Sequence, residues 1–430
     1  MKRLSISILI VLFSIFLGFL LLLASNQIPA RLIEDKCRES APFLSEAGVY
    51  PVEQYSGHKL DNFSDCVMLL VATYPGEEPS LDRTMSSYFL HVQEKSPYDS
   101  FVRIYSGRPN LEIETSEYAR YWHGYLLSLR PLFTKLNYMQ ILQLNQCVQY
   151  TLLLLVLLLL YRKLPACLLP FLLTVLFLAP TTIGRSLHYS SVYSIMLLSS
   201  LLLLWNPGGK LTGESVWLLF LLAGIVTSFL DVLTAPTLTL TIPLCMLGVL
   251  LSRRGTAREN LRILVRCGFF WFVGYAGMWA GKWLLSALLL GSDSLRTVLA
   301  KILVYTVSTE KRHFATPLAS LRRNLAELFN NWDLNCLAIL LAVLLVIAVL
   351  RSRRTLSRRD LADSLLLLLP ALVPFVWIFV LKNHTHRHFF FTFRTMAPLI
   401  FSPLCALSVL ASARPGRAAE RSHRRAGAAD

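Results

Sequence analysis

Long apolar blocks alternate with short polar connectors along most of this chain. Blocks such as TLLLLVLLLL (151–160) and LAILLAVLLVIAVL (337–350) approach the roughly 20 residues that a helix needs to cross the hydrocarbon of a bilayer. Because a backbone in lipid must satisfy its own hydrogen bonds, we expect these blocks to be helices. The pattern predicts an all-α integral membrane protein with about ten transmembrane helices. The expected spans lie at residues 4–24, 145–161, 165–182, 187–205, 215–231, 235–252, 264–289, 335–350, 363–381 and 394–412.

One long polar segment, residues 25–140, interrupts this pattern directly after the first span and contains most of the acidic residues. The expected organisation is a first transmembrane helix (1–24), a large extracytoplasmic loop domain with interfacial helices (25–140), a bundle of about nine helices (141–412) and a basic cytoplasmic tail (413–430). A second polar stretch, 291–333, is mildly amphipathic and is expected at the membrane interface.

The formal net charge of +16 is informative because of where the basic residues lie along the chain. Lys and Arg cluster in short connectors beside apolar blocks, which is the signature of membrane orientation and argues against a nucleic-acid partner. With the N-terminus inside, every cytoplasmic connector is basic: MKR, YRK, NPGGK, SRRGTARENLR, RSRRTLSRR and the C-terminal tail. The predicted location is therefore the cell membrane, as a multi-pass protein with both termini cytoplasmic and residues 25–140 outside.

Carboxylates in the outer loop are the first candidates for chemistry. Asp61 and Asp65 in LDNFSD lie four residues apart and share a face if the segment is helical. Paired carboxylates can act as a general base or hold a divalent cation. Glu34 and Asp35, closer to the first span, are rival candidates. The alternative is structural, with Asp61 as the N-cap of a helix that continues into CVMLLVA.

The segment EYARYWHGYLLSLRPLF (117–133) is the second candidate. Its aromatic residues suit the level of the lipid headgroups. Arg120, His123 and Arg130 could bind a phosphate together, because a guanidinium binds phosphate in a bidentate manner. The alternative is an interfacial anchor whose arginines extend toward the headgroups.

Two charged side chains are predicted inside the outer part of spans. Asp231, in SFLDVLTAP, is expected to be buried and paired, because a carboxylate in the membrane usually faces the bundle interior. Lys282, in GYAGMWAGKW, could pair with Asp231 or meet a lipid phosphate, and the alternative is a lysine that reaches the surface. Gly274, Gly277 and Gly281 should allow another helix to approach closely.

The segment NHTHRHFFFTFR (383–394) is the last candidate. His384, His386 and His388 alternate, so on a strand they would share a face and could bind zinc. No partner carboxylate is nearby and the segment resembles a re-entrant turn, and both features argue against zinc. The sequence assigns no metal and no cofactor. His388 and Arg394, at the outer start of the last span, are predicted to contact an anion such as a phosphate.

The cysteines and the search for motifs of soluble enzymes add little to the functional prediction. Cys37 and Cys66 share the outer loop and could pair in an oxidising compartment, while the other six cysteines fall within or next to spans. The chain contains no GxGxxG at a strand–helix turn, no GxxxxGK[ST], no GxSxG and no HExxH. Chemistry driven by ATP is therefore not expected.

The layout resembles the GT-C superfamily of membrane glycosyltransferases, in which a first span is followed by a large outer loop with acidic residues and then by many spans. LDNFSD, YARYWHGYLLSLRPL, FLDVLTAP, GYAGMWAGKW and HFFFTFR also look like a group of uncharacterised bacterial multi-pass membrane proteins. The GT-C resemblance implies an outer-loop carboxylate that deprotonates the acceptor, and basic side chains that bind the phosphate of a polyprenyl-linked sugar donor.

The leading hypothesis is accordingly a glycosyltransferase of the cell envelope that uses a lipid-linked sugar at the extracytoplasmic face. The alternatives are a lipid or solute transporter or flippase, in which Asp231 and Lys282 would be coupling groups, and a non-catalytic envelope assembly protein. The expected partners are the lipid bilayer and the lipid-linked sugar donor.

Overall fold

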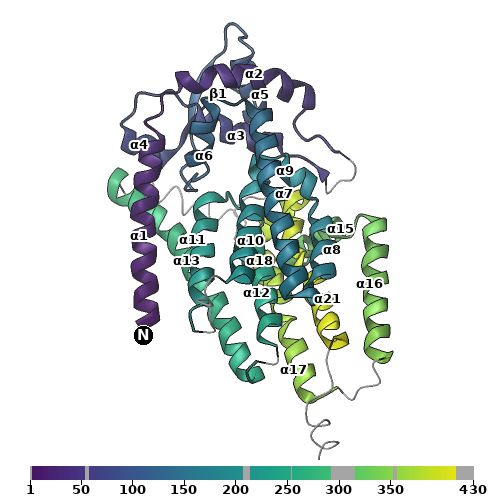
Figure 1. The fold of residues 1–430 in the computed structure, drawn as a ribbon. Coiled ribbons are helices and arrows are strands. Elements are labelled where there is room, and N and C mark those ends of the chain that lie inside the picture. The colour runs from purple at the N-terminus through teal and green to yellow at the C-terminus, as the bar shows by residue number, and fades with distance from the viewer. Residues whose placement is uncertain are drawn as a thin grey trace, which may run out of the picture.

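The computed structural model of the chain describes residues 2–53, 58–206, 214–252, 254–291, 315–351 and 356–412. Most of these residues are helical, as the apolar blocks predict (Figure 1). In the described part, β1 (Tyr88–Val92) and β2 (Ile113–Glu117) form a single two-stranded antiparallel sheet. The predicted basic tail, 413–430, lies outside the described residues.

Seven described helical segments are long and apolar enough to cross a membrane. They are α1 (Lys2–Ser25), α7 (Tyr138–Lys163), α10 (Leu187–Trp205), α13 (Ala257–Leu290), α16 (Trp332–Arg351), Arg358–Val380 and Phe389–Ala411. The segment Arg358–Val380 comprises α17 (Arg358–Leu366), η4 (Leu369–Leu372) and α18 (Val373–Val380), and Phe389–Ala411 comprises α20 (Phe389–Thr392), η5 (Phe393–Met396) and α21 (Pro398–Ala411). Such helices are typical of a membrane protein.

The expected spans at 165–182, 215–231 and 235–252 coincide with shorter apolar helices. These are Pro165–Leu178, made of η2 (Pro165–Cys167) and α8 (Leu168–Leu178), followed by α11 (Trp217–Leu230) and α12 (Leu238–Leu251). The number of crossings and their direction therefore stay predictions.

The polar segment folds at one end of the helix bundle, opposite the N-terminus of α1 (Figure 1). Its described residues contain the two-stranded sheet and five α-helices, which are α2 (Arg31–Ala47), α3 (Asn62–Ala72), α4 (Ser80–Ser86), α5 (Pro97–Tyr105) and α6 (Leu126–Phe133). Its core is continuous with that of the long helices, because Leu69 and Phe101 belong to the same apolar cluster as Leu22 and Met278. The segment is thus packed onto the bundle.

Three glycines of α13 allow close helix packing, as predicted. A Cβ at Gly274 would lie 2.3 Å from the carbonyl oxygen of Leu221 on α11. Cβ atoms at Gly277 and Gly281 would lie 2.9 Å from Cγ1 of Val11 and 2.2 Å from Cδ1 of Ile15, both on α1. These residues hold α13 against two neighbouring helices.

The region after α13 is partly described. Of the second polar stretch, residues 292–314 lie outside the described residues, and the remainder forms the amphipathic helix α15 (Pro317–Leu328) before α16. Between α18 and α20 the chain forms α19 (Lys382–Arg387). The strand on which the alternating histidines would share a face is therefore absent, because residues 382–387 are helical.

Candidate functional site

Asp61 lies at the start of α3, where its carboxylate accepts hydrogen bonds from the backbone N–H of Ser64 (3.0 Å) and from the Ser64 hydroxyl (2.7 Å). This is the N-cap that the sequence offered as the structural alternative. The same carboxylate has a second partner. Nδ1 of His188, the second residue of α10, lies 3.2 Å from Oδ2 of Asp61.

The Asp61–His188 pair is buried, with exposed fractions of 2% and 5%. Burial alone would raise the pKa of Asp61, but the adjacent His188 imidazole, together with both hydrogen bonds from Ser64, outweighs it and lowers that pKa. Asp61 is therefore an ionised carboxylate next to an imidazole. Such a pair can orient a histidine that moves a proton.

Asp65 has a different role. Its carboxylate accepts four hydrogen bonds, from the Tyr138 hydroxyl (2.6 Å), the Ser186 hydroxyl (3.1 Å) and the backbone N–H groups of Leu187 and His188 (both 2.9 Å). The first N–H groups of a helix have no partner within that helix, so Asp65 caps α10 from another element. Burial raises the pKa of Asp65, although the hydrogen bonds counteract it.

Aromatic rings connect His188 to the segment around α19 and α20. The His188 ring centroid lies 4.9 Å from that of Phe391, and the Phe391 ring stacks on His388 at 5.3 Å. The rings of His388 and His384 are 4.9 Å apart. The structure thus brings two of the predicted histidines close to the Asp61 pair. No group of three His, Cys, Asp or Glu in the described residues has a geometry that could hold a metal ion.

Asp231 is buried directly after α11, as predicted, but its partners belong to its own turn. Its carboxylate accepts bonds from the N–H of Leu233 (3.0 Å) and from the N–H and hydroxyl of Thr234 (3.1 and 2.6 Å). Leu233 has φ of +73°, which is strained for a leucine. Its carbonyl oxygen lies 2.9 Å from Nε2 of His384. Asp231 therefore stabilises the turn on which His384 rests.

Arg394 is buried in η5. Its Nε donates to the carbonyl oxygen of Leu178 (2.9 Å), and its guanidinium lies 4.5 Å from the centroid of the Tyr189 ring. The hydroxyl of Tyr189 donates to the carbonyl oxygen of Lys59 (3.1 Å). The Tyr189 ring centroid lies 5.5 Å from that of His188, so Arg394 and the Lys59 backbone both contact a direct neighbour of the Asp61–His188 pair.

Lys59 places a second cation near this site. Its Nζ lies 4.6 Å from the Tyr50 ring centroid and 4.8 Å from the Phe390 ring centroid. Phe390 adjoins Phe391, which contacts His188. Cations over aromatic faces are favourable and remain available to an anion.

The predicted phosphate clamp of Arg120, His123 and Arg130 is not assembled. Arg130 donates to the carbonyl oxygens of Ser25 (3.0 Å), Ala72 and Ile28, and so ties α6 to the ends of α1 and α3. His123 is buried with both ring nitrogens in contact with protein oxygens.

His123 bonds the Tyr125 hydroxyl through Nδ1 (2.9 Å) and the Tyr118 carbonyl oxygen through Nε2 (2.8 Å). Burial lowers the pKa of His123 to about 3. The Arg120 guanidinium packs on the Tyr118 ring, 4.8 Å from its centroid. These side chains consequently stabilise the polar segment.

Lys282 does not pair with Asp231. It is 1% exposed, its Nζ donates to the carbonyl oxygen of Met85 (2.6 Å) and it lies 5.6 Å from the Trp122 ring centroid. The predicted contact with Asp231 and the alternative of a lysine that reaches the surface are therefore not realised, and the contact with a lipid phosphate stays a prediction. The lysine instead joins α13 to α4.

The rival carboxylates lie on the surface of α2, apart from the pair. Glu34 forms an ion pair with Arg38 (2.5 Å) and Asp35 is exposed. Cys37 and Cys66 are buried free thiols.

The structure adds His188, Tyr189 and Lys59 to the residues that the sequence singled out, and makes Asp65 a positioning residue. The signal for His188 was the polar run SLHYSS immediately before an apolar block, on the predicted outer face. The candidate site therefore consists of Asp61, His188, His388 and Arg394. Three further residues stabilise the elements around it: Asp65 caps α10, and Asp231 and His384 stabilise the turn after α11.

Comparison with protein-family models, with curated proteins and with solved structures finds no match. The resemblance to the GT-C superfamily is therefore carried by layout alone.

Proposed function

We propose that this chain is a membrane glycosyltransferase that takes a sugar from a polyprenyl-phosphate carrier at the face of the membrane where the polar segment lies. The observation that supports the proposal is the buried Asp61–His188 pair at the end of the bundle that carries the polar segment. Arg394 is linked to this pair through the Tyr189 ring, and Lys59 is linked to it through the rings of Phe390 and Phe391. A base next to cations fits a reaction in which a hydroxyl is deprotonated and a phosphate departs.

In the proposed reaction, His188 accepts the proton of the acceptor hydroxyl and Asp61 orients its ring through Nδ1. The acceptor oxygen forms a bond to the anomeric carbon of the sugar while the bond from that carbon to the phosphate oxygen breaks. The electron pair leaves with the polyprenyl phosphate. Arg394 and Lys59 stabilise the negative charge on that phosphate.

Other residues position this machinery. Asp65 binds the N–H of His188 and so fixes the start of α10 relative to α3. Asp231 and His384 brace the turn between α11 and α12. Loss of either contact would move the rings that enclose His188, and small misplacements of a base are costly to catalysis.

A groove of about 250 Å³ supports a lipid donor. It lies between α6, α7 and α10 and has a largely apolar wall that includes Leu129, Leu144 and Leu187, with Ser190 and Asn145 among the polar groups. Leu187 directly precedes His188, so the groove begins next to the proposed base. We propose that it holds the first isoprene units of the donor.

A transporter is the second candidate, because Asp231 and His384 are buried ionisable residues in a bundle of apolar helices. The release of polyprenyl phosphate distinguishes a glycosyltransferase from a transporter. A transporter would move the lipid-linked sugar across proteoliposomes without releasing polyprenyl phosphate, whereas a transferase would release it.

The test uses purified chain in proteoliposomes with a panel of polyprenyl-phosphate-linked hexoses and a mixture of envelope glycan acceptors. Release of polyprenyl phosphate by the wild type, reduced in Arg394→Gln, is expected. Arg108→Gln is the control, because Arg108 is exposed on the polar segment. Absence of release with every donor, or equal release by Arg394→Gln, would reject the proposal.

A further inference from the structure

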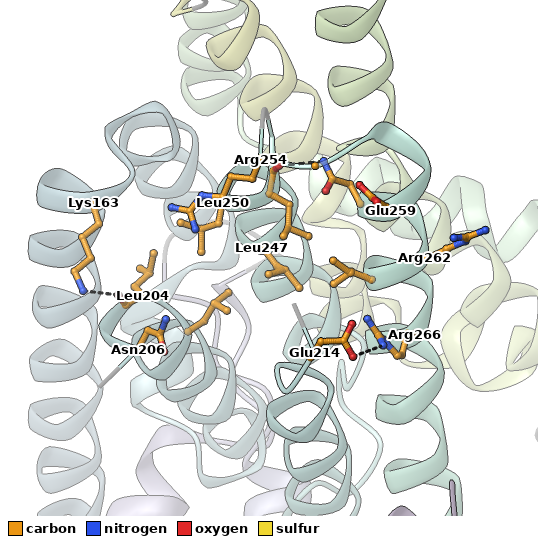
Figure 2. A pocket seen from close by; sticks show the side chains of 15 residues that line it. Lys163, Leu204, Asn206, Glu214, Leu247, Leu250, Arg254, Glu259, Arg262 and Arg266 are labelled. Atoms are coloured by element: carbon orange, nitrogen blue, oxygen red, sulfur yellow. Dashed lines mark hydrogen bonds and ion pairs between the residues drawn. The ribbon is translucent and has the colours of Figure 1, made fainter. Parts of the chain in front are cut away.

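A second polar site lies at the opposite end of the bundle. A cavity of about 1070 Å³ is bounded by the C-terminal ends of α7, α10 and α12 and by the first turns of α13 (Figure 2). The Asp61–His188 pair is at the N-terminal end of α10, so the two sites are separated by the length of that helix. This end carries the connectors predicted to be cytoplasmic.

The walls of the cavity are of two kinds. Leucines of α10 and α12, among them Leu204, Leu247 and Leu250, form an apolar wall. Cationic side chains lie around it: Lys163, Arg254, Arg262 and Arg266. Figure 2 shows Lys163 on one side and Arg266 on the other, with Leu247 and Leu250 between them.

Positive charge predominates among the described residues that line the cavity. The four cationic side chains outnumber the two carboxylates, Glu214 and Glu259. Glu214 already forms ion pairs with Arg3 and with Arg266, the latter at 3.7 Å. Glu259 accepts the backbone N–H of Thr256 (2.8 Å) in the capping box of α13.

Lys163 adds positive charge to the cavity, and no acidic residue in the described structure pairs with it. Its Nζ donates to the carbonyl oxygens of Leu204 (2.8 Å) and Trp205 (3.0 Å) at the end of α10. These partners are neutral, so the full charge of Lys163 persists at the cavity. On α13, Arg262 and Arg266 are four residues apart and therefore share one helical face.

We propose that this cavity binds the phosphate of an anionic phospholipid from the predicted cytoplasmic leaflet. Arg254, which lies beside Leu250 in Figure 2, would hold the phosphate through charge-assisted hydrogen bonds, with Arg262 adding positive charge at the rim and with the glycerol and upper acyl chain against the leucines. Basic pockets between helices at this level are suited to anionic headgroups. A free phosphate ester shares the headgroup chemistry but would gain nothing from the leucine wall.

The proposal is independent of catalysis, so its test measures binding and stability. Purified chain in phosphatidylcholine nanodiscs receives increasing fractions of phosphatidylglycerol, and thermal unfolding is followed. We expect the unfolding midpoint of the wild type to rise with the anionic lipid. Parallel arms with inorganic phosphate and with glycerol phosphate distinguish a lipid from a soluble phosphate.

The variants are Arg254→Gln and Arg262→Gln, singly and combined, with Arg258→Gln as the matched control. Arg258 is exposed on the same helix as Arg262 and does not line the cavity. Each cavity variant should weaken the response to phosphatidylglycerol by about fivefold, and Arg258→Gln should not.

Three outcomes would overturn the proposal. The first is an equal response to phosphatidylglycerol in the double variant and the wild type, with both correctly folded by circular dichroism. The second is an equal loss in Arg258→Gln, which would indicate general surface charge. The third is full stabilisation by inorganic phosphate or glycerol phosphate alone, which would reject the lipid as the ligand.

Discussion

Nδ1 of His188 lies 3.2 Å from Oδ2 of Asp61, and this contact joins the start of α10 to the start of α3. Asp65, on the same helix as Asp61, binds the backbone N–H of His188. The two carboxylates of LDNFSD therefore divide their roles: Asp61 faces the imidazole, whereas Asp65 caps the helix that carries it.

Asp65→Asn is expected to destabilise the protein more than Asp61→Asn. An amide offers one acceptor oxygen where the Asp65 carboxylate offers two, so donors from Tyr138, Ser186 and α10 lose partners in a buried site, at a cost of about 1–3 kcal/mol. Asn is as good an N-cap as Asp, so the cap of α3 survives at position 61. Thermal unfolding in detergent measures both variants. A lower midpoint for Asp61→Asn than for Asp65→Asn would contradict the division of roles.

The close packing of α13 against α11 is tested by Gly274→Val. A Cβ there would lie 2.3 Å from the carbonyl oxygen of Leu221, so the helices must separate, at a cost of about 1–3 kcal/mol. Gly268→Val is the matched control, because a Cβ at Gly268 meets nothing within 4 Å on the same helix. We expect a lower unfolding midpoint for Gly274→Val only, and equal midpoints would show that the contact is unimportant.

His123→Asn should reduce the acid sensitivity of stability. The unfolded chain binds a proton at position 123 below about pH 6.5, whereas burial keeps the folded side chain neutral down to about pH 3. Wild-type stability should therefore fall, as pH decreases from 6.5 toward 3, by about 1.4 kcal/mol per unit more than that of the variant.

Asn suits this test of His123 because it tolerates the positive φ of +55° at that position. Unfolding midpoints of the two proteins are compared from pH 7 to pH 4.5. Parallel curves would mean that His123 is protonated in the folded state.

The predicted orientation is tested by placing one cysteine at either end of the bundle, in a variant whose exposed Cys147 and Cys336 are changed to serine. Glu46→Cys lies on α2 in the polar segment and Arg258→Cys lies in the first turn of α13, and both positions are exposed. In intact cells, a membrane-impermeant maleimide should label the first and leave the second unlabelled until the cells are opened. Labelling of position 258 alone would invert the topology and place the polar segment inside.

The long helices could be predicted from the sequence because their signal is local. An apolar run such as 337–350 specifies a helix whatever its neighbours are, and α16 appears there. Glycine spacing likewise predicted the packing of α13. The alternation of His384, His386 and His388 would place them on one face only in a strand, and residues 382–387 are helical.

The candidate site was only partly predictable because its contacts join distant segments. Asp61 and Arg394 were identified as unusual polar groups, but nothing near Asp61 in the sequence identifies His188 as its partner. Nor does the sequence distinguish an arginine that binds carbonyl oxygens, such as Arg130, from one that binds a ligand. That distinction depends on the tertiary packing of α1, α3 and α6.

The most direct test of the proposed function is the rate at which polyprenyl phosphate is released from a labelled polyprenyl-phosphate hexose by four proteins: the wild type, Asp61→Asn, His188→Gln and the double variant. Each single change should lower the rate by about 10²–10⁴-fold, and the double variant should be no slower than His188→Gln, because the two residues act as a unit. Glu46→Gln, an exposed carboxylate of the polar segment, should keep the full rate. Wild-type release by His188→Gln, at an unchanged unfolding midpoint, would contradict the assignment.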